Sequence, residues 1–142
     1  MQNEYEYKKN IHEIDIADPL LKHYVGLAWV GISIPVIIGV NGMMVQGHII
    51  SAAQYHEESI ASIERNMSSG SECDAISSWH IGALNVYKSS SHEDKYKAEI
   101  KYVHLNNVAI LNANGNPTRF NDFLMRINIK DINSFMLGSV MQ

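Results

Sequence analysis

The sequence predicts an α+β fold, in which a small, bent antiparallel β-sheet carries an N-terminal helix and an inserted helical segment. Three observations predict it. Residues 18–29 have apolar side chains at helical spacing. Residues 32–40 and 43–50 are rich in β-branched and other apolar residues and are joined by Asn41-Gly42, a strong hairpin signal. Helical patterning then fills residues 51–88, and strand patterning returns after residue 100.

Composition fits a soluble packed domain. The chain has 142 residues, of which 46% are hydrophobic and 18% charged, so we expect a flexible leader over residues 1–17 and a single domain over residues 18–142. The net charge is −4 and the basic residues are scattered, which argues against nucleic acid as a partner. A lone cysteine, Cys73, cannot form an intrachain disulfide, and this favours a reducing compartment.

The first residues carry both charges and lack an early apolar stretch, so no secretion signal is expected, although residues 11–16 have the pattern of a short strand. Asp18-Pro19 then predicts a helix start. Aspartate caps free backbone N–H groups, and proline suits the first helical position because it has no N–H to satisfy.

Residues 24–40 are uncharged and allow two interpretations. A membrane span needs about 20 apolar residues, and this segment is shorter and interrupted by glycines and Pro35. We therefore favour a buried helix followed by a buried strand, with Pro35 at an edge or bulge. No membrane span is expected.

Asn41 and Gly42 both tolerate positive φ, as a type I′ turn requires, and they are assigned as the structural turn of the hairpin. Gly47, inside the return strand, predicts a bulge or a close approach of another backbone. Ser51 and Gln54 have the spacing of a capping box and are assigned as the helix cap.

Two amphipathic helices are expected after this cap. The first ends at about Asn66, and residues 68–71 break it. The second runs from about Asp74 to Lys88. Its expected inward side chains are Ile76, Trp79, Ala83, and Val86 or Tyr87.

Strand patterning returns in the last third. Residues 100–105 and 108–111 form two runs separated by Asn106-Asn107. Residues 123–130 alternate, with Phe123, Met125, Ile127 and Ile129 expected on one face. Residues 134–140 form an apolar terminal strand, which can add to a neighbouring sheet or a partner chain.

Motifs for catalysis or metal binding are weak. The seven histidines form no HxH or HExxH spacing, and there is no CxxC, P-loop or G-x-S-x-G pattern. His48 and His104 lie in predicted strands and could meet beside a carboxylate, which leaves an enzyme or metal protein as one hypothesis. Half-buried structural histidines are the simpler interpretation, so no catalytic, cofactor-binding or metal residue is assigned.

Three ordered stretches are similar to the gas vesicle accessory protein U family. They are "GVNGMMVQGHIISAAQYHE" (residues 39–57), "YVHLNNVAIL" (102–111) and "RINIKDINSFMLGSV" (126–140). In the third stretch the family usually has an aromatic residue and a glycine beside the arginine, whereas Met125 and Ile127 flank Arg126 here. Residues 68–96 are also longer than the family pattern.

The resemblance implies a non-enzymatic cytoplasmic accessory protein without a cofactor. It would associate with gas vesicles or their shell protein, influence assembly or clustering, and act as a homo-oligomer. The candidate interaction surface is Arg126, Phe135, Leu137 and Gly138. The alternative is a small Sm-like or SH3-like binding module for RNA or peptide, suggested by the short strands around Asn41-Gly42.

Overall fold

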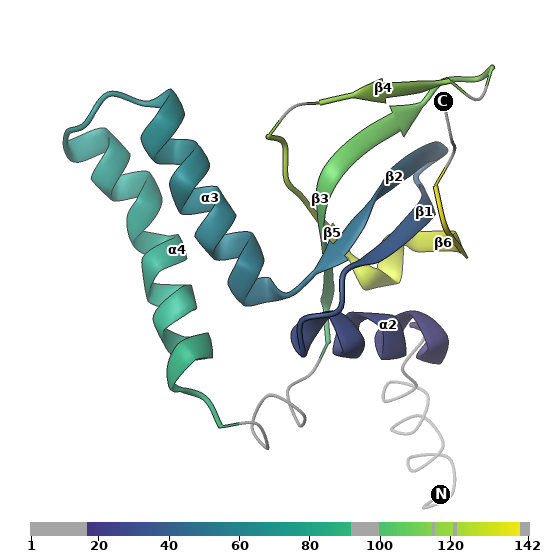
Figure 1. Ribbon diagram of the computed structural model, residues 1–142, viewed down its shortest axis with the longest axis horizontal. Coiled ribbons are helices and arrows are strands. Elements are labelled where there is room, and N and C mark those ends of the chain that lie inside the picture. The colour runs from purple at the N-terminus through teal and green to yellow at the C-terminus, as the bar shows by residue number, and fades with distance from the viewer. Residues whose placement is uncertain (1–16, 92–99, 115, 121, 140–142) are drawn as a thin grey trace, which may run out of the picture.

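A computed structural model describes residues 17–91, 100–114, 116–120 and 122–139 (Figure 1). The strand predicted at residues 11–16 lies outside these ranges. The elements follow in this order: α2 (Pro19–Trp29), β1 (Ile34–Val40), β2 (Met43–Ile50), α3 (Ala52–Asn66), α4 (Ser71–Ser89), β3 (Tyr102–Leu111), β4 (Pro117–Arg119), β5 (Met125–Asn128), the 3₁₀-helix η1 (Ile129–Asp131) and β6 (Ile132–Leu137).

The six strands form one antiparallel sheet. Neighbouring strands follow the order β4-β3-β2-β1-β6, and β5 also pairs with β3. The first half of β3 pairs with β5 and its second half with β4. With the N-terminal helix and the helices inserted between β2 and β3, this architecture confirms the predicted α+β fold (Figure 1).

The two runs expected on either side of Asn106-Asn107 are in fact one strand, β3, so that part of the prediction was wrong. Asn107 has a φ of 49°, and the pairing of β2 with β3 shifts register between Gln46 and His48. A bulge of this kind bends a strand without ending it. Asparagine tolerates positive φ, so the asparagine pair that resembles a turn in the sequence accommodates the bulge instead.

One face of the sheet packs against α2 and forms the main core. The helix contributes Leu21, Val25 and Ala28, each at most 2% exposed. The strand side chains of this core are also buried, and six of them are fully buried: Val36, Ile38, Val45, Ile49, Val103 and Leu105. The uncharged segment 24–40 is therefore the second half of α2 followed by β1. Within the described ranges, no helix has the length and hydropathy needed to cross a membrane.

The start of α2 follows the local signals in the sequence. The Asp18 carboxylate accepts hydrogen bonds from the backbone N–H groups of Leu20 at 2.8 Å and Leu21 at 3.3 Å. Pro19 occupies the first turn, where its missing N–H has no partner to lose.

Helices α3 and α4 pack against each other as a hairpin that projects from the sheet (Figure 1). The side chains that α4 buries are Cys73, Ser77 and Leu84. The predicted inward face was largely wrong, because Ile76, Trp79 and Val86 are 49%, 59% and 64% exposed. The apolar arc of α4 is wider than the single helix α3 can cover, and α3 packs on only one side of that arc.

The alternation predicted over residues 123–130 holds for a shorter segment. Phe123 precedes β5 and is 60% exposed, whereas Ile127 and Ile129 are buried. Strand β5 ends at Asn128, whose side chain accepts a hydrogen bond from the Lys130 backbone N–H at 3.1 Å. The 3₁₀-helix η1 then connects β5, which pairs with β3, to β6, which pairs with β1 at the opposite end of the strand order.

Candidate interaction surface

The four residues assigned to an interaction surface lie in two separate places. Arg126 is on β5 opposite His104 of β3, whereas Phe135 is on β6 opposite Ile38 of β1. Ile38 belongs to the core beneath α2, and His104 lies on the opposite face of the sheet, toward α3. The structure therefore contains two candidate surfaces, one at β6 and one around Arg126.

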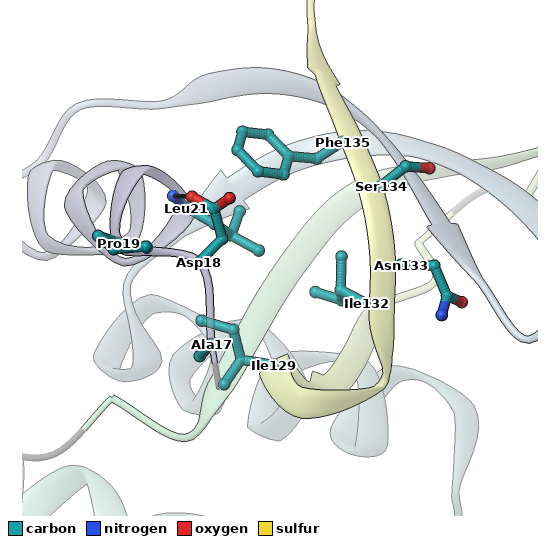
Figure 2. Close-up of a pocket in the computed structure, with 9 residues that line it drawn as sticks. All are labelled: Ala17, Asp18, Pro19, Leu21, Ile129, Ile132, Asn133, Ser134 and Phe135. Carbon is teal, nitrogen blue, oxygen red and sulfur yellow. Dashed lines mark hydrogen bonds between the residues drawn. The ribbon is translucent and has the colours of Figure 1, made fainter. Parts of the chain in front are cut away.

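At β6, an open groove of about 620 Å³ separates the strand from the start of α2. Figure 2 shows the Phe135 ring pointing from β6 toward α2, while Asn133 and Ser134 point the other way. The ring is half-buried and meets Tyr24 edge-on, with 6.0 Å between ring centroids. Phe135 thus helps to close the core and also forms one wall of the groove.

The end of β6 is exposed and apolar. Met136 and Leu137 are 53% and 58% exposed. Gly138 follows with a φ of 107°, and its N–H donates to the Pro35 carbonyl at 2.8 Å, which holds the strand end against β1. In the described part of the chain β6 pairs only with β1, so its outer edge offers backbone groups and apolar side chains to a partner.

The surface around Arg126 is aromatic. The Arg126 guanidinium carbon lies 3.8 Å from the Tyr102 ring centroid and 5.6 Å from that of Trp79. Tyr102 is on β3 and Trp79 is on α4, so this cation–π contact joins the helical hairpin to the sheet.

Beside Arg126 lies a histidine cluster that sequence reasoning missed. His56 of α3 and His80 of α4 approach with 2.9 Å between their Nδ1 atoms, and His104 of β3 lies 6.3 Å from His56 between ring centroids. His56 and His104 are 2% and 5% exposed. Because two protonated Nδ1 atoms repel, the His56–His80 hydrogen bond requires at least one neutral ring.

Burial lowers the pKa of all three imidazoles. Desolvation, followed by the positive charge of Arg126, lowers the pKa of His104 to about 3. Desolvation and the neighbouring His80 lower the pKa of His56 to about 4, and the pKa of His80 is also lowered. Neither ring nitrogen of His104 has a hydrogen-bond partner among the described residues, so charging it there would leave an uncompensated buried cation.

A second groove, of about 500 Å³, lies between the helical hairpin and residues 122–124. Its apolar walls come from Ile63 of α3, Ile76 of α4 and Phe123. The Phe123 ring also packs edge-on against Phe120, with 5.4 Å between centroids. These side chains extend the exposed apolar side of α4 toward the sheet.

The other residues assigned from the sequence lie in the hairpin turn, in β2 and at the start of α3. Asn41 and Gly42 have φ values of 49° and 78° and connect β1 to β2. At Gly47 an added Cβ would lie 3.1 Å from the Asn106 carbonyl oxygen and 3.2 Å from the Leu105 Cβ. The Ser51 hydroxyl accepts a hydrogen bond from the Gln54 N–H at 3.0 Å, which is one half of a capping box.

The hypothesis of a metal site depends on where the histidines and acidic side chains lie. In the described ranges, no three histidine, cysteine or acidic side chains are arranged to hold a metal ion. His48 and His104 do not meet: His48 Nδ1 lies 3.4 Å from Asn107 Nδ2, while His104 joins the cluster with α3. Only the contact between three distant segments creates this cluster, so no local spacing in the sequence reveals it.

A family model described as "Gas vesicle protein GvpU-like" matches residues 18–140, from the cap of α2 to just beyond β6. No match was found among the curated proteins or among the solved structures.

Proposed function

Because this chain belongs to the gas vesicle protein GvpU-like family, we propose that it is a non-enzymatic, cytoplasmic accessory protein that binds gas vesicles or their shell protein and influences vesicle assembly or clustering. The match over residues 18–140 is the single observation that carries this proposal, since it includes every described helix and strand. The exposed apolar side chains and the free strand edge support binding to other proteins.

The end of β6 is the surface we assign to the vesicle. Met136 and Leu137 are exposed on a strand that has one unpaired edge in the described structure, while Phe135 and Gly138 hold that strand in place. An added strand gains main-chain hydrogen bonds along such an edge, and exposed side chains give it specificity. Arg126 contacts the rings of Tyr102 and Trp79, so we assign it to positioning the hairpin and not to the vesicle contact.

Flotation with purified gas vesicles tests the proposal, because bound protein rises with the buoyant vesicles. The wild-type chain is expected to float well above the level of an unrelated acidic protein. The double variant Met136→Asp, Leu137→Asp should lose at least tenfold in the bound fraction. Asn133→Asp adds a charge to the same strand at an exposed position away from this end and should bind as wild type.

Two results would count against the proposal. If the wild-type chain floats no more than the unrelated acidic protein, the vesicle is not its partner. If both β6 variants bind as wild type, the vesicle contact lies elsewhere on the molecule.

The bent sheet with its N-terminal helix also supports an alternative function as a small peptide- or RNA-binding module of the Sm-like or SH3-like kind. A peptide could add to β6 in the same way as a vesicle protein. RNA is less compatible with the net charge of −4. A salt-dependent mobility shift of single-stranded RNA at micromolar protein would favour this alternative.

A further inference from the structure

One face of α4, defined here as Ile76, Trp79, Ala83 and Val86, has no partner helix along its whole length in the described structure, although one side of the Trp79 ring contacts His56 of α3 and the Arg126 guanidinium. Three of these side chains are about half to two-thirds exposed, and Ala83 is half-buried at the margin of the contact with α3. Their spacing of three, four and three residues is the spacing of a helix–helix seam. The side chains that α4 buries, Cys73, Ser77 and Leu84, lie on the neighbouring side, where α3 packs.

We propose that this face binds the same face of a second copy of the chain, with the two α4 helices antiparallel. The inference rests on the proposed function, because clustering of vesicles needs a contact between copies. It adds a surface distinct from β6.

The sequence of α4 is self-complementary under a twofold axis. Ile76 and Val86 lie equally far on either side of residue 81, and so do Trp79 and Ala83. An antiparallel pair centred there places Ile76 against Val86 of the copy and the bulky Trp79 against the small Ala83 of the copy. Alternation of large and small side chains is what allows two helices to interlock closely.

The absence of charged residues and the presence of a glycine near the middle of α4 also favour the close approach of two α4 helices. Residues 75–86 contain no Asp, Glu, Lys or Arg, so pairing these faces buries no formal charge. Gly82 lies on the seam side near the middle of the helix, and an added Cβ there would meet no atom within 4 Å, which leaves room for another helix. Antiparallel helices also align their dipoles favourably.

The available area indicates a weak dimer. Trp79 and Phe123 are 59% and 60% exposed, which together amounts to roughly 250 Å² of aromatic surface. Ile76 and Val86 add to it, and the groove beside Ile76 and Phe123 can receive Val86 of the copy. A stable interface usually needs about 800 Å² per partner, so this contact should form reversibly, in the micromolar range.

Sedimentation velocity of the purified chain, without vesicles, tests the pairing. Wild type should shift from monomer to dimer as its concentration rises from about 1 to about 500 µM. Val86→Glu should raise the dimer dissociation constant at least tenfold, because it buries a charge in the seam. Asn85→Glu adds the same charge one residue away, off the seam, and should change the constant less than twofold.

A mixing experiment tests the register. Ile76→Lys should likewise raise the dimer dissociation constant at least tenfold, whereas an equimolar mixture of Ile76→Lys and Val86→Glu should return it close to the wild-type value, since the two new charges face each other only in the antiparallel pair. A wild-type chain that stays monomeric at 500 µM overturns the proposal. So does a dimer whose dissociation constant Val86→Glu leaves unchanged, or a mixture that associates no more tightly than the single variants.

The vesicle is kept out of this test so that the two proposals can fail separately. If wild type is monomeric but Val86→Glu reduces flotation with vesicles, the face belongs to the vesicle contact and the second copy is excluded. If dimerisation follows the predicted register while flotation fails, the pairing stands without the vesicle function.

Discussion

The sheet core and the helical hairpin differ in what they bury. Beneath α2 the fully buried side chains are large and aliphatic, such as Val36, Ile38 and Ile49. In the hairpin, α3 buries Ala52, His56 and Ser59, while α4 leaves its bulkiest apolar side chains exposed. Burial of apolar area is the main favourable term in folding, so the sheet core carries the stability and the hairpin presents surface.

The largest expected effect comes from making the same substitution in each region. Ile49→Ala removes a fully buried side chain and should lower the free energy of unfolding by about 2–5 kcal/mol. Ile76→Ala removes a side chain that is 49% exposed and should cost less than about 1 kcal/mol. Urea denaturation at concentrations where the chain is monomeric measures both. Equal losses would contradict the contrast between core and hairpin.

Acid should destabilise the contact between the hairpin and the sheet, where His56 of α3 and His104 of β3 are buried. The folded-state pKa of His56 is about 4 and that of His104 about 3, both below the ordinary value of 6.5. The unfolded chain therefore binds more protons between these values, and the stabilisation present above pH 6.5 is lost as the pH falls. Each histidine contributes a slope of at most about 1.4 kcal/mol per pH unit.

His104→Phe isolates this contribution from the carboxylates, which titrate in both proteins. It should flatten the pH dependence of the unfolding free energy between pH 6.5 and 4. It should be neutral or stabilising at pH 7, because it removes two buried nitrogens that lack partners in the described structure. Urea titrations across this pH range measure the difference, and parallel curves would mean that His104 does not titrate as described.

Two glycines should respond oppositely to the same change. Gly47→Ala places a methyl group against the Asn106 carbonyl and should destabilise the chain by about 1–3 kcal/mol. In α2, Gly26→Ala meets no atom within 4 Å and should stabilise by about 0.5–1 kcal/mol, since alanine favours helix. Thermal denaturation of the two variants compares them, and the same sign for both would refute the close approach at Gly47.

A small effect is expected at the junction of the two regions. Ser51→Ala removes the acceptor for the Gln54 N–H and should cost about 1 kcal/mol. Ser51→Asp keeps an acceptor at the same position and should retain most of the stability. Thermal melts followed by circular dichroism can resolve these differences, and a Ser51→Ala chain as stable as wild type would show that water replaces the cap.

Local signals in the sequence predicted most helices and strands. The features that depend on contacts between distant segments were not predicted. The Asp18-Pro19 start and the hairpin at Asn41-Gly42 depend on neighbouring residues, and the structure has both. The orientation of α4 depends on which part of a wide apolar arc meets α3, and periodicity cannot decide this. The Arg126 and histidine cluster needs α3, α4, β3 and β5 together, and the β6 groove needs α2 beside β6.

The hairpin leaves the sheet after Ile50 and the chain rejoins it at β3, where Ile50 pairs with His104. The two attachment points are thus immediate neighbours, whatever the length of chain between them. The entropic cost of closing a loop grows only slowly with its length, so the hairpin can be lengthened or shortened while β2 and β3 stay in register. Insertions or deletions in α3 and α4 can therefore change how far the hairpin extends from the sheet without disturbing the sheet core.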